Sequence, residues 1–231
     1  MTPSVYAAEA ETNVMGAGNT QLEFKLGVVR DTASDTRVRF TPFLARLGIT
    51  ESVELRLSAD GRVVSKSAGV TTKGWADANI GLRWQQSALD EKAGTAGVAW
   101  QFDVGIPTGT QAFSSDKVAS SAKVAAEWAF ANDMSLGVMP GLSRQHNGTD
   151  WYVAPSLAIT LGKNWTPQLR TVAELVAPQL TSRSNGGNVA TFNLGATYSL
   201  SDTFELEAVY LRGLTSNTPD HTLVFGVNVK F

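Results

Sequence analysis

The sequence predicts an all-β protein, a transmembrane antiparallel β-barrel of about twelve strands. Apolar and polar residues alternate with period two along nearly the whole chain, charge is confined to one face of that alternation, and short connections alternate with long ones. Charged residues make up 17% of the 231 residues, below the roughly 25% usual for soluble domains. No run of 18 apolar residues occurs, so any membrane crossing must use strands.

Residues 96–106 show the alternation most clearly. Val98, Trp100, Phe102 and Val104 share one face, and small or polar residues occupy the other, because side chains two apart in a strand point the same way. Most of the segments are near the 9–11 residues that cross a bilayer at a tilt. The twelve expected strands are 19–29, 36–47, 53–61, 75–85, 95–107, 117–130, 134–144, 151–162, 166–176, 188–200, 203–212 and 221–231.

Charged side chains fall on the polar face, which is also rich in Gly, Ala and Ser, so we expect that face to line a confined lumen. Arg37 joins the lumen candidates, whereas Arg46 is assigned to the apolar face, from which its long side chain could reach the headgroups. Cations from early strands could oppose carboxylates from late strands across the lumen, or the charges could pair into a stiffening network. The lumen candidates are Arg39, Arg56, Asp77, Arg83, Asp103, Lys123, Glu127, Arg170, Glu174, Glu205 and Glu207.

Connection lengths predict the orientation of the barrel in the membrane. Short turns are expected at 48–52, 131–133, 162–164 and 201–202, and longer loops at 62–74, 108–116, 145–150, 177–187 and 213–220. Outer-membrane barrels have short periplasmic turns and long extracellular loops, so we expect both termini in the periplasm. An error of one hairpin in this division would give ten or fourteen strands.

The two ends of the chain indicate export. Ala7, Ala8 and Ala10 resemble the end of a secretory signal peptide, so residues 1–11 are expected to be a signal-peptide remnant or a disordered N-terminus. Residues 12–231 form a single barrel domain. Phe231 closes an alternating last strand and looks like the signal read by the barrel assembly machinery. The expected location is the Gram-negative outer membrane.

Several stretches resemble the outer-membrane "MetA-pathway of phenol degradation" family, whose members are regarded as transporters of small, often aromatic, compounds. The ending 212–231 is similar to the family's through Gly213, Leu214, Pro219, Asp220, Gly226 and Phe231, and Pro107, Thr108 and Gly109 look like its Pro-Thr-Gly motif. Residues 74–84 and the strand from Val53 are also similar to family strands. The resemblance implies a barrel and suggests transport, and it carries over no catalytic residues.

Twelve strands give a backbone diameter of roughly 24 Å and a lumen of about 10 Å, which suits a small solute. We therefore expect a narrow channel or transporter for small solutes, including aromatic or hydrophobic ones. Two alternatives remain: a closed structural or binding barrel whose loops meet a partner, and a lipid-modifying enzyme that uses the loop residues His146 and His221.

The remaining function classes are not favoured. A net charge of -2 without a basic block argues against nucleic acid. Two histidines and no cysteine give no metal site, and no Gly-rich phosphate loop is present, so no cofactor or enzymatic activity is expected. The expected partners are outer-membrane lipids and lipopolysaccharide, the barrel assembly machinery and a small-molecule solute.

Overall fold

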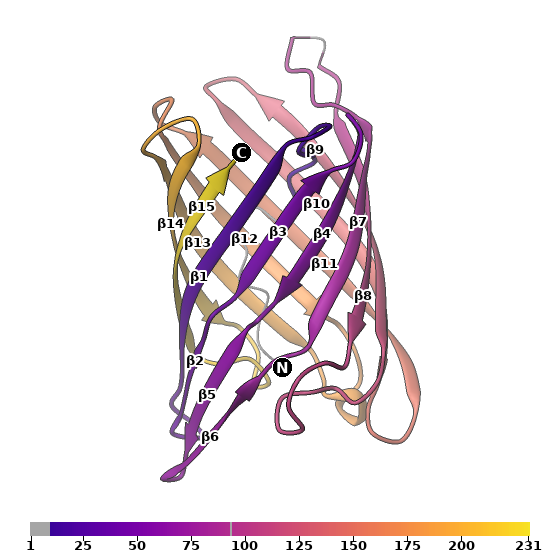
Figure 1. Ribbon diagram of the computed structural model, residues 1–231, viewed down its shortest axis with the longest axis vertical. Helices are drawn as coiled ribbons and strands as arrows, with labels where there is room; N and C mark the ends of the chain where they lie inside the picture. The colour runs from indigo at the N-terminus through magenta and orange to yellow at the C-terminus, as the bar shows by residue number, and fades with distance from the viewer. Residues whose placement is uncertain (1–9, 93) are drawn as a thin grey trace.

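The computed structural model describes residues 10–92 and 94–231, which form one antiparallel sheet closed on itself (Figure 1). Neighbouring strands follow one another around the sheet, and the last strand pairs with the first from Gln21 opposite Lys230 to Arg30 opposite His221. The strands are β1 (Thr20–Asp31), β2 (Thr36–Phe40), β3 (Phe43–Gly48), β4 (Val53–Ala59), β5 (Arg62–Ser67), β6 (Val70–Trp75), β7 (Ala78–Ser87), β8 (Gly97–Ile106), β9 (Ala119–Phe130), β10 (Met134–His146), β11 (Trp151–Asn164), β12 (Leu169–Gln179), β13 (Val189–Ser199), β14 (Phe204–Gly213) and β15 (His221–Lys230).

Three of the barrel strands are interrupted near the same level. β2 and β3 both pair with β1. β5 then pairs with β2 and β4 with β3, and in the next position β6 pairs with β5 and β7 with β4. Pro42 lacks the N–H that a ladder needs, and Gly61 takes a positive φ of 63°. Because each interrupted pair is one barrel strand, the fifteen segments make the twelve-stranded barrel that the sequence predicts.

The long loop expected at 62–74 is wrong, because these residues form the hairpin of β5 and β6. Ala68 and Gly69, both at positive φ, make its two-residue turn, as such hairpins require. The third and fourth barrel strands are therefore longer than predicted, and this hairpin projects at one end of the barrel (Figure 1).

Short and long connections are separated less cleanly than the sequence predicts, because the end opposite the termini holds the longest connection, 107–118, but also the short turns at 32–35, 68–69 and 147–150. The turns at 49–52, 131–133, 165–168 and 200–203 share the end of the barrel that holds Thr20 and Phe231, which exchange two backbone hydrogen bonds. A longer connection, 88–96, also lies at this end. In the described part of the chain the short 3-10 turn η1 (Arg183–Asn185) is the one helical element, and no helix could span a membrane.

The barrel is apolar outside and polar inside. Phe24, Leu26 and Val28 on β1 are about half exposed, whereas Glu23 and Lys25, at the alternating positions, are buried. Apolar side chains on the outer face of a barrel meet lipid acyl chains, and the closed ladder leaves no strand edge open to them. This sorting is that of an outer-membrane barrel.

The facing predicted for residues 36–47 is wrong. Arg39 pairs with exposed Val28, so Arg39 and Arg37 point outward, while Leu44 and Arg46 point inward beside Glu23 and Gln21. The prediction assumed that apolar side chains always face lipid. Here Phe40 is completely buried inside the barrel, so the apolar face of β2 is the inner one, whereas in β3 the apolar residues Phe43, Ala45 and Leu47 face outward.

Phe40 belongs to an apolar cluster on the inner face of β1, β2, β5, β14 and β15. Gly27 is essential to its packing, because a Cβ there would overlap the Phe40 ring. Close packing of this kind makes the loss of a large side chain costly. The cluster comprises Val29, Phe40, Val63, Val209, Leu211 and Val224, with Val38, Ala76 and Phe113 packed against it.

We predict that Phe40→Ala lowers the free energy of unfolding by about 3–5 kcal/mol, the usual range for a buried Phe. Phe225→Ala is the comparison variant: Phe225 is 60% exposed on the outer face, so its loss removes the transfer of a ring into lipid but leaves no internal cavity, and the free energy of unfolding should fall by less. Denaturant unfolding of the refolded barrel in lipid vesicles, followed by tryptophan fluorescence, measures both. Equal losses in the two variants would show that Phe40 is not a core residue.

Candidate functional site

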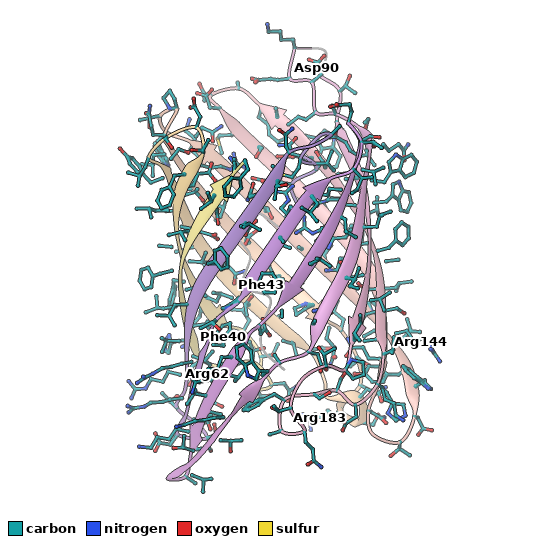
Figure 2. The ribbon with its side chains drawn as sticks, in the orientation of Figure 1. Phe40, Phe43, Arg62, Asp90, Arg144 and Arg183 are labelled. Carbon is teal, nitrogen blue, oxygen red and sulfur yellow. The ribbon has the colours of Figure 1, made fainter. Side chains whose placement is uncertain are left out.

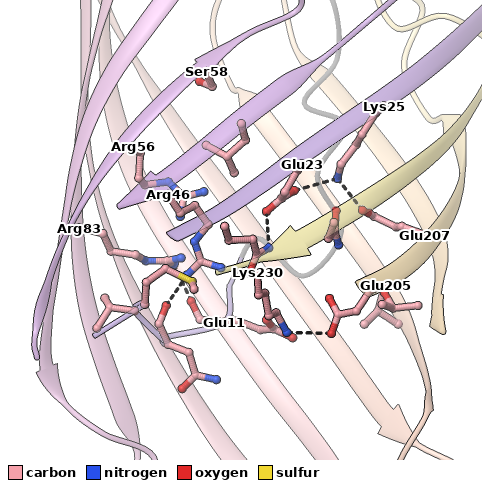
Figure 3. Close-up of a pocket in the computed structure, with 18 of the residues that line it drawn as sticks. Glu11, Glu23, Lys25, Arg46, Arg56, Ser58, Arg83, Glu205, Glu207 and Lys230 are labelled. Atoms are coloured by element: carbon pink, nitrogen blue, oxygen red, sulfur yellow. Dashed lines mark hydrogen bonds and ion pairs between the residues drawn. The ribbon is translucent and has the colours of Figure 1, made fainter. Parts of the chain in front are cut away.

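The interior contains a charged cavity of about 940 Å³ (Figure 3). Its wall comes from strands all around the barrel and from the N-terminal segment. Cations and carboxylates are nearly balanced in number, so the site has no strong net charge. The charged lining residues are Glu11, Glu23, Lys25, Arg46, Arg56, Asp60, Arg83, Asp103, Lys123, Arg170, Glu205, Glu207 and Lys230.

The described N-terminal residues 10–18, named here the lumen segment, begin inside the barrel. Ala10 and Thr12 are completely buried. Small residues on the wall make the space, because a Cβ at Gly137 would crowd Ala10 and one at Gly48 would overlap the Gly16 carbonyl. Residues 1–9 lie outside the described part of the chain, so the signal-peptide remnant stays a prediction.

Wall side chains hold the lumen segment through its backbone. The Glu127 carboxylate accepts hydrogen bonds from the Thr12 N–H at 3.1 Å and hydroxyl at 3.2 Å. Gln85 and Arg83 donate to the carbonyls of Thr12 and Glu11. These contacts satisfy backbone groups that would otherwise be buried without a partner.

Glu54 is the centre of the arginine-rich wall. It is completely buried and accepts hydrogen bonds from Arg46 at 2.9 and 3.1 Å and from Arg56 at 2.6 Å. It also accepts the Met15 N–H at 3.0 Å, while Arg46 donates to the Asn13 carbonyl. A buried carboxylate between two guanidiniums compensates their desolvation, and here it also ties down the lumen segment.

The wall formed by β14, β15 and β1 carries carboxylates paired with lysines (Figure 3). Lys25 lies 2.7 Å from Glu207 and 3.3 Å from Glu23, and Lys230 lies 2.8 Å from Glu205. The lumen therefore shows both expected arrangements of its charges, separated walls and local ion pairs. Arginines and carboxylates are concentrated on different strands, and many of them form ion pairs within their own part of the wall.

Seven of the eleven predicted lumen residues line the cavity: Arg56, Arg83, Asp103, Lys123, Arg170, Glu205 and Glu207. Glu127 and Glu174 are buried within the barrel but outside the cavity lining, and Glu174 accepts a hydrogen bond from Thr160 at 2.7 Å. Arg39 faces outward, and Asp77 binds a loop instead.

The prediction missed six of the charged lining residues: Glu11, Glu23, Lys25, Arg46, Asp60 and Lys230. Glu23 and Lys25 alternate with Leu22, Phe24 and Leu26, so their inward direction was available from the pattern. Glu11 could not be found in this way, because the lumen segment has no strand periodicity.

Asp77 fixes the loop between β8 and β9 against the break between β6 and β7. Its carboxylate accepts hydrogen bonds from the N–H groups of Gly109 at 2.9 Å and Ser115 at 2.7 Å and from the Ser115 hydroxyl. Burial raises the pKa of Asp77, but hydrogen bonds from Ser115, Gly109 and Ser114 outweigh it and hold the pKa below its usual value. The loop also bonds to β6, where the Thr110 N–H donates to Trp75.

The motif residues noted in the sequence are turn and docking positions. Thr108 accepts the Ala78 N–H at 3.0 Å, and a Cβ at Gly109 would crowd Trp75 and Asp77. Asp220 accepts the Thr32 N–H at 2.9 Å, and a Cβ at Gly213 would overlap the Pro219 carbonyl. These residues pack the loops of one end of the barrel together.

This architecture has known relatives. The family model described as "Putative MetA-pathway of phenol degradation" matches residues 4–231. The chain belongs to this family. No curated protein matches the sequence.

Solved structures share the fold at low sequence identity. An outer membrane channel from Pseudomonas putida F1 is 13% identical with a TM-score of 0.74, and the match covers 99% of this chain and 100% of that one. The KdgM porin in complex with disordered oligogalacturonate is 9% identical with a TM-score of 0.61, covering 91% and 99%. The NanC porin is 13% identical with a TM-score of 0.58, covering 91% and 100%. These likenesses show the barrel fold.

The histidines considered for an enzyme have local roles. His146 Nδ1 accepts the Gly148 N–H, and its ring meets the edge of Trp151. His221 Nδ1 lies 2.8 Å from the Tyr210 hydroxyl. Within residues 10–92 and 94–231, no group of three His, Asp or Glu is placed to hold a metal.

We predict that Asp77→Asn increases the hydrogen-exchange rate of the Gly109 and Ser115 amides by roughly tenfold, about 1.4 kcal/mol for a charged acceptor made neutral. In the native protein the protection should be complete above the usual Asp pKa and fall as the pH drops through the lowered pKa, because only the ionised carboxylate holds the loop fully. Asp116→Asn in the same loop is the control. Unchanged exchange in Asp77→Asn would exclude the anchoring role.

Proposed function

We propose that this protein is a narrow outer-membrane channel for small solutes, in which the lumen segment forms the constriction. The observation that carries this proposal is the lumen itself: a charged cavity of about 940 Å³ remains beside a segment bonded to several strands. The barrel fold, shared with an outer membrane channel and two porins, supports it. Four of the five connections at the end that holds both termini are three or four residues long, and the longest connection between described strands, 107–118, lies at the other end, which supports a periplasmic position for the termini.

The lining favours solutes that carry a polar or charged group. Apolar side chains such as Leu44, Met139 and Val172 are a minority among the lining residues, and a purely hydrophobic solute would leave many polar groups without hydrogen-bond partners. A single aromatic ring bearing a hydroxyl or carboxylate could contact the apolar lining residues with its ring and form hydrogen bonds to the polar ones. The phenol-degradation description of the family is consistent with this size and chemistry.

We predict that removing residues 1–18 raises the single-channel conductance several-fold, because conductance follows the open cross-section of the lumen. The measurement uses refolded 19–231 and full chain in planar bilayers, after heat-modifiability in gels has shown that both are folded. Glu127→Gln weakens the hydrogen bonds to Thr12, so its single-channel conductance should switch frequently between the level of the native full chain and a larger one. Identical conductance of the full chain and 19–231 would contradict a constricting segment.

We also predict opposite selectivity changes from two lumen variants. Lys123→Gln should shift the reversal potential in a salt gradient toward cations and Glu205→Gln toward anions, each changing the permeability ratio roughly two- to fivefold, the effect of ~1 kcal/mol from one screened charge. Arg144→Gln, an exposed position on β10, is the control. Shifts of the same sign, or none, would exclude these residues from the solute path. A folded but electrically silent full chain would favour the closed binding barrel.

A further inference from the structure

One flank of the outer surface carries a group of six exposed cations at the end of the barrel opposite the termini. The register and exposure of the strands show that their side chains point outward from β1, β2, β5 and β6. Figure 1 shows these strands around the projecting hairpin. We name this group the basic patch. Its members are Arg30, Arg37, Arg39, Arg62, Lys66 and Lys73.

The register places like charges directly opposite one another. Arg30 pairs with Arg37, and Arg37 pairs with Lys66. On the other side of Arg30 the neighbouring positions on β15 and β14 hold His221 and Arg212, and the Arg212 guanidinium lies 2.8 Å from His221 Nε2. Like charges directly opposite on neighbouring strands destabilise a sheet, so the row of Arg30, Arg37 and Lys66 favours an anion from outside the chain.

The described chain does not supply that anion. None of the six patch residues forms an ion pair with a described carboxylate. The strands concerned carry no outward Asp or Glu, because their outward positions hold only apolar, hydroxyl-bearing, aromatic or basic side chains. Asp220, near Arg212, already accepts hydrogen bonds from Thr32.

The patch directly borders the apolar belt. On β1 the outward side chain next to Arg30 is Val28, followed by Leu26 and Phe24, which are 51% and 52% exposed. Trp75, 59% exposed, lies beside Arg62, where an aromatic ring suits the membrane interface. A lipid with its acyl chains on the belt would therefore carry its headgroup at the level of the cations.

We propose that the basic patch binds the phosphate groups of lipid A, the anionic lipid of the leaflet that surrounds this end if the termini are periplasmic. Guanidinium groups bind phosphate in a bidentate manner, and the long stems of Arg and Lys can lie along the belt while their charges reach the headgroup. A free phosphate ion would use the cations but not the adjoining apolar stripe. The site is separate from the lumen, so it can fail without affecting the proposed channel.

The test measures binding of diphosphoryl lipid A to the refolded full chain in neutral detergent by native mass spectrometry. Arg30→Gln, Arg37→Gln and Lys66→Gln are combined in one variant. Each cation near a phosphate contributes about fivefold in affinity, so we expect a loss of roughly a hundredfold. Heat-modifiability and unchanged single-channel conductance verify that the variant barrel is intact.

Arg144→Gln is the matched control. Arg144 is exposed at the same end of the barrel, but it lies on the opposite flank from Arg62 (Figure 2) and stacks over the Trp151 ring at 3.9 Å. It should bind lipid A as the native chain does. Binding should also weaken at high salt, because exposed charges are screened.

Four results would overturn the proposal. The first is native affinity in the triple variant, and the second is equal affinity for lipid A stripped of its phosphates. The third is displacement of lipid A by inorganic phosphate at comparable concentrations, which would indicate a site for free phosphate. A preference for phosphatidylglycerol over lipid A would overturn the assignment to this lipid, whereas a preference for lipid A supports it.

Discussion

Closure of the sheet is the constraint on which the rest of the structure depends. Within a bilayer no water is present to satisfy backbone N–H and C=O groups, so a strand with an open edge is unstable there. The ten residue pairs between β1 and β15 remove that edge. Closure then leaves each strand with one face toward lipid and one toward a confined interior, and at the level of the apolar belt the charged side chains go to the interior.

Placing charges in a narrow interior creates a second requirement, which is compensation. Glu54, Glu127 and Glu207 are almost completely buried, and a buried carboxylate is unstable without cations or hydrogen-bond donors. Arg46 and Arg56 supply these for Glu54, and Lys25 for Glu207. For Glu127 the N–H and the hydroxyl of Thr12 are donors. The lumen segment is thus part of the electrostatic balance of the barrel as well as an obstacle in it.

The sequence predicted the fold well because the period-two signal is local. Strands such as β8, with Trp100 and Phe102 outward and Gln101 and Asp103 inward, can be read without knowledge of their neighbours. The lumen segment could not be predicted, because its position depends on contacts with Glu54 and Glu127 far along the chain. Asp77 shared the polar parity of its strand, but a break in that strand directs it to a loop.

The observed facing of residues 36–47, which the sequence did not predict, determines two features of the molecule. In a strand a change of facing moves every side chain to the other side of the sheet, so a single choice places Phe40 in the interior and Arg37 and Arg39 on the outer surface together. The interior position is favoured by Gly27, whose missing side chain leaves room for the Phe40 ring. Burial of one aromatic ring thus brings two arginines beside Arg30 and Lys66. The inner apolar cluster and the basic patch are therefore two consequences of the same register.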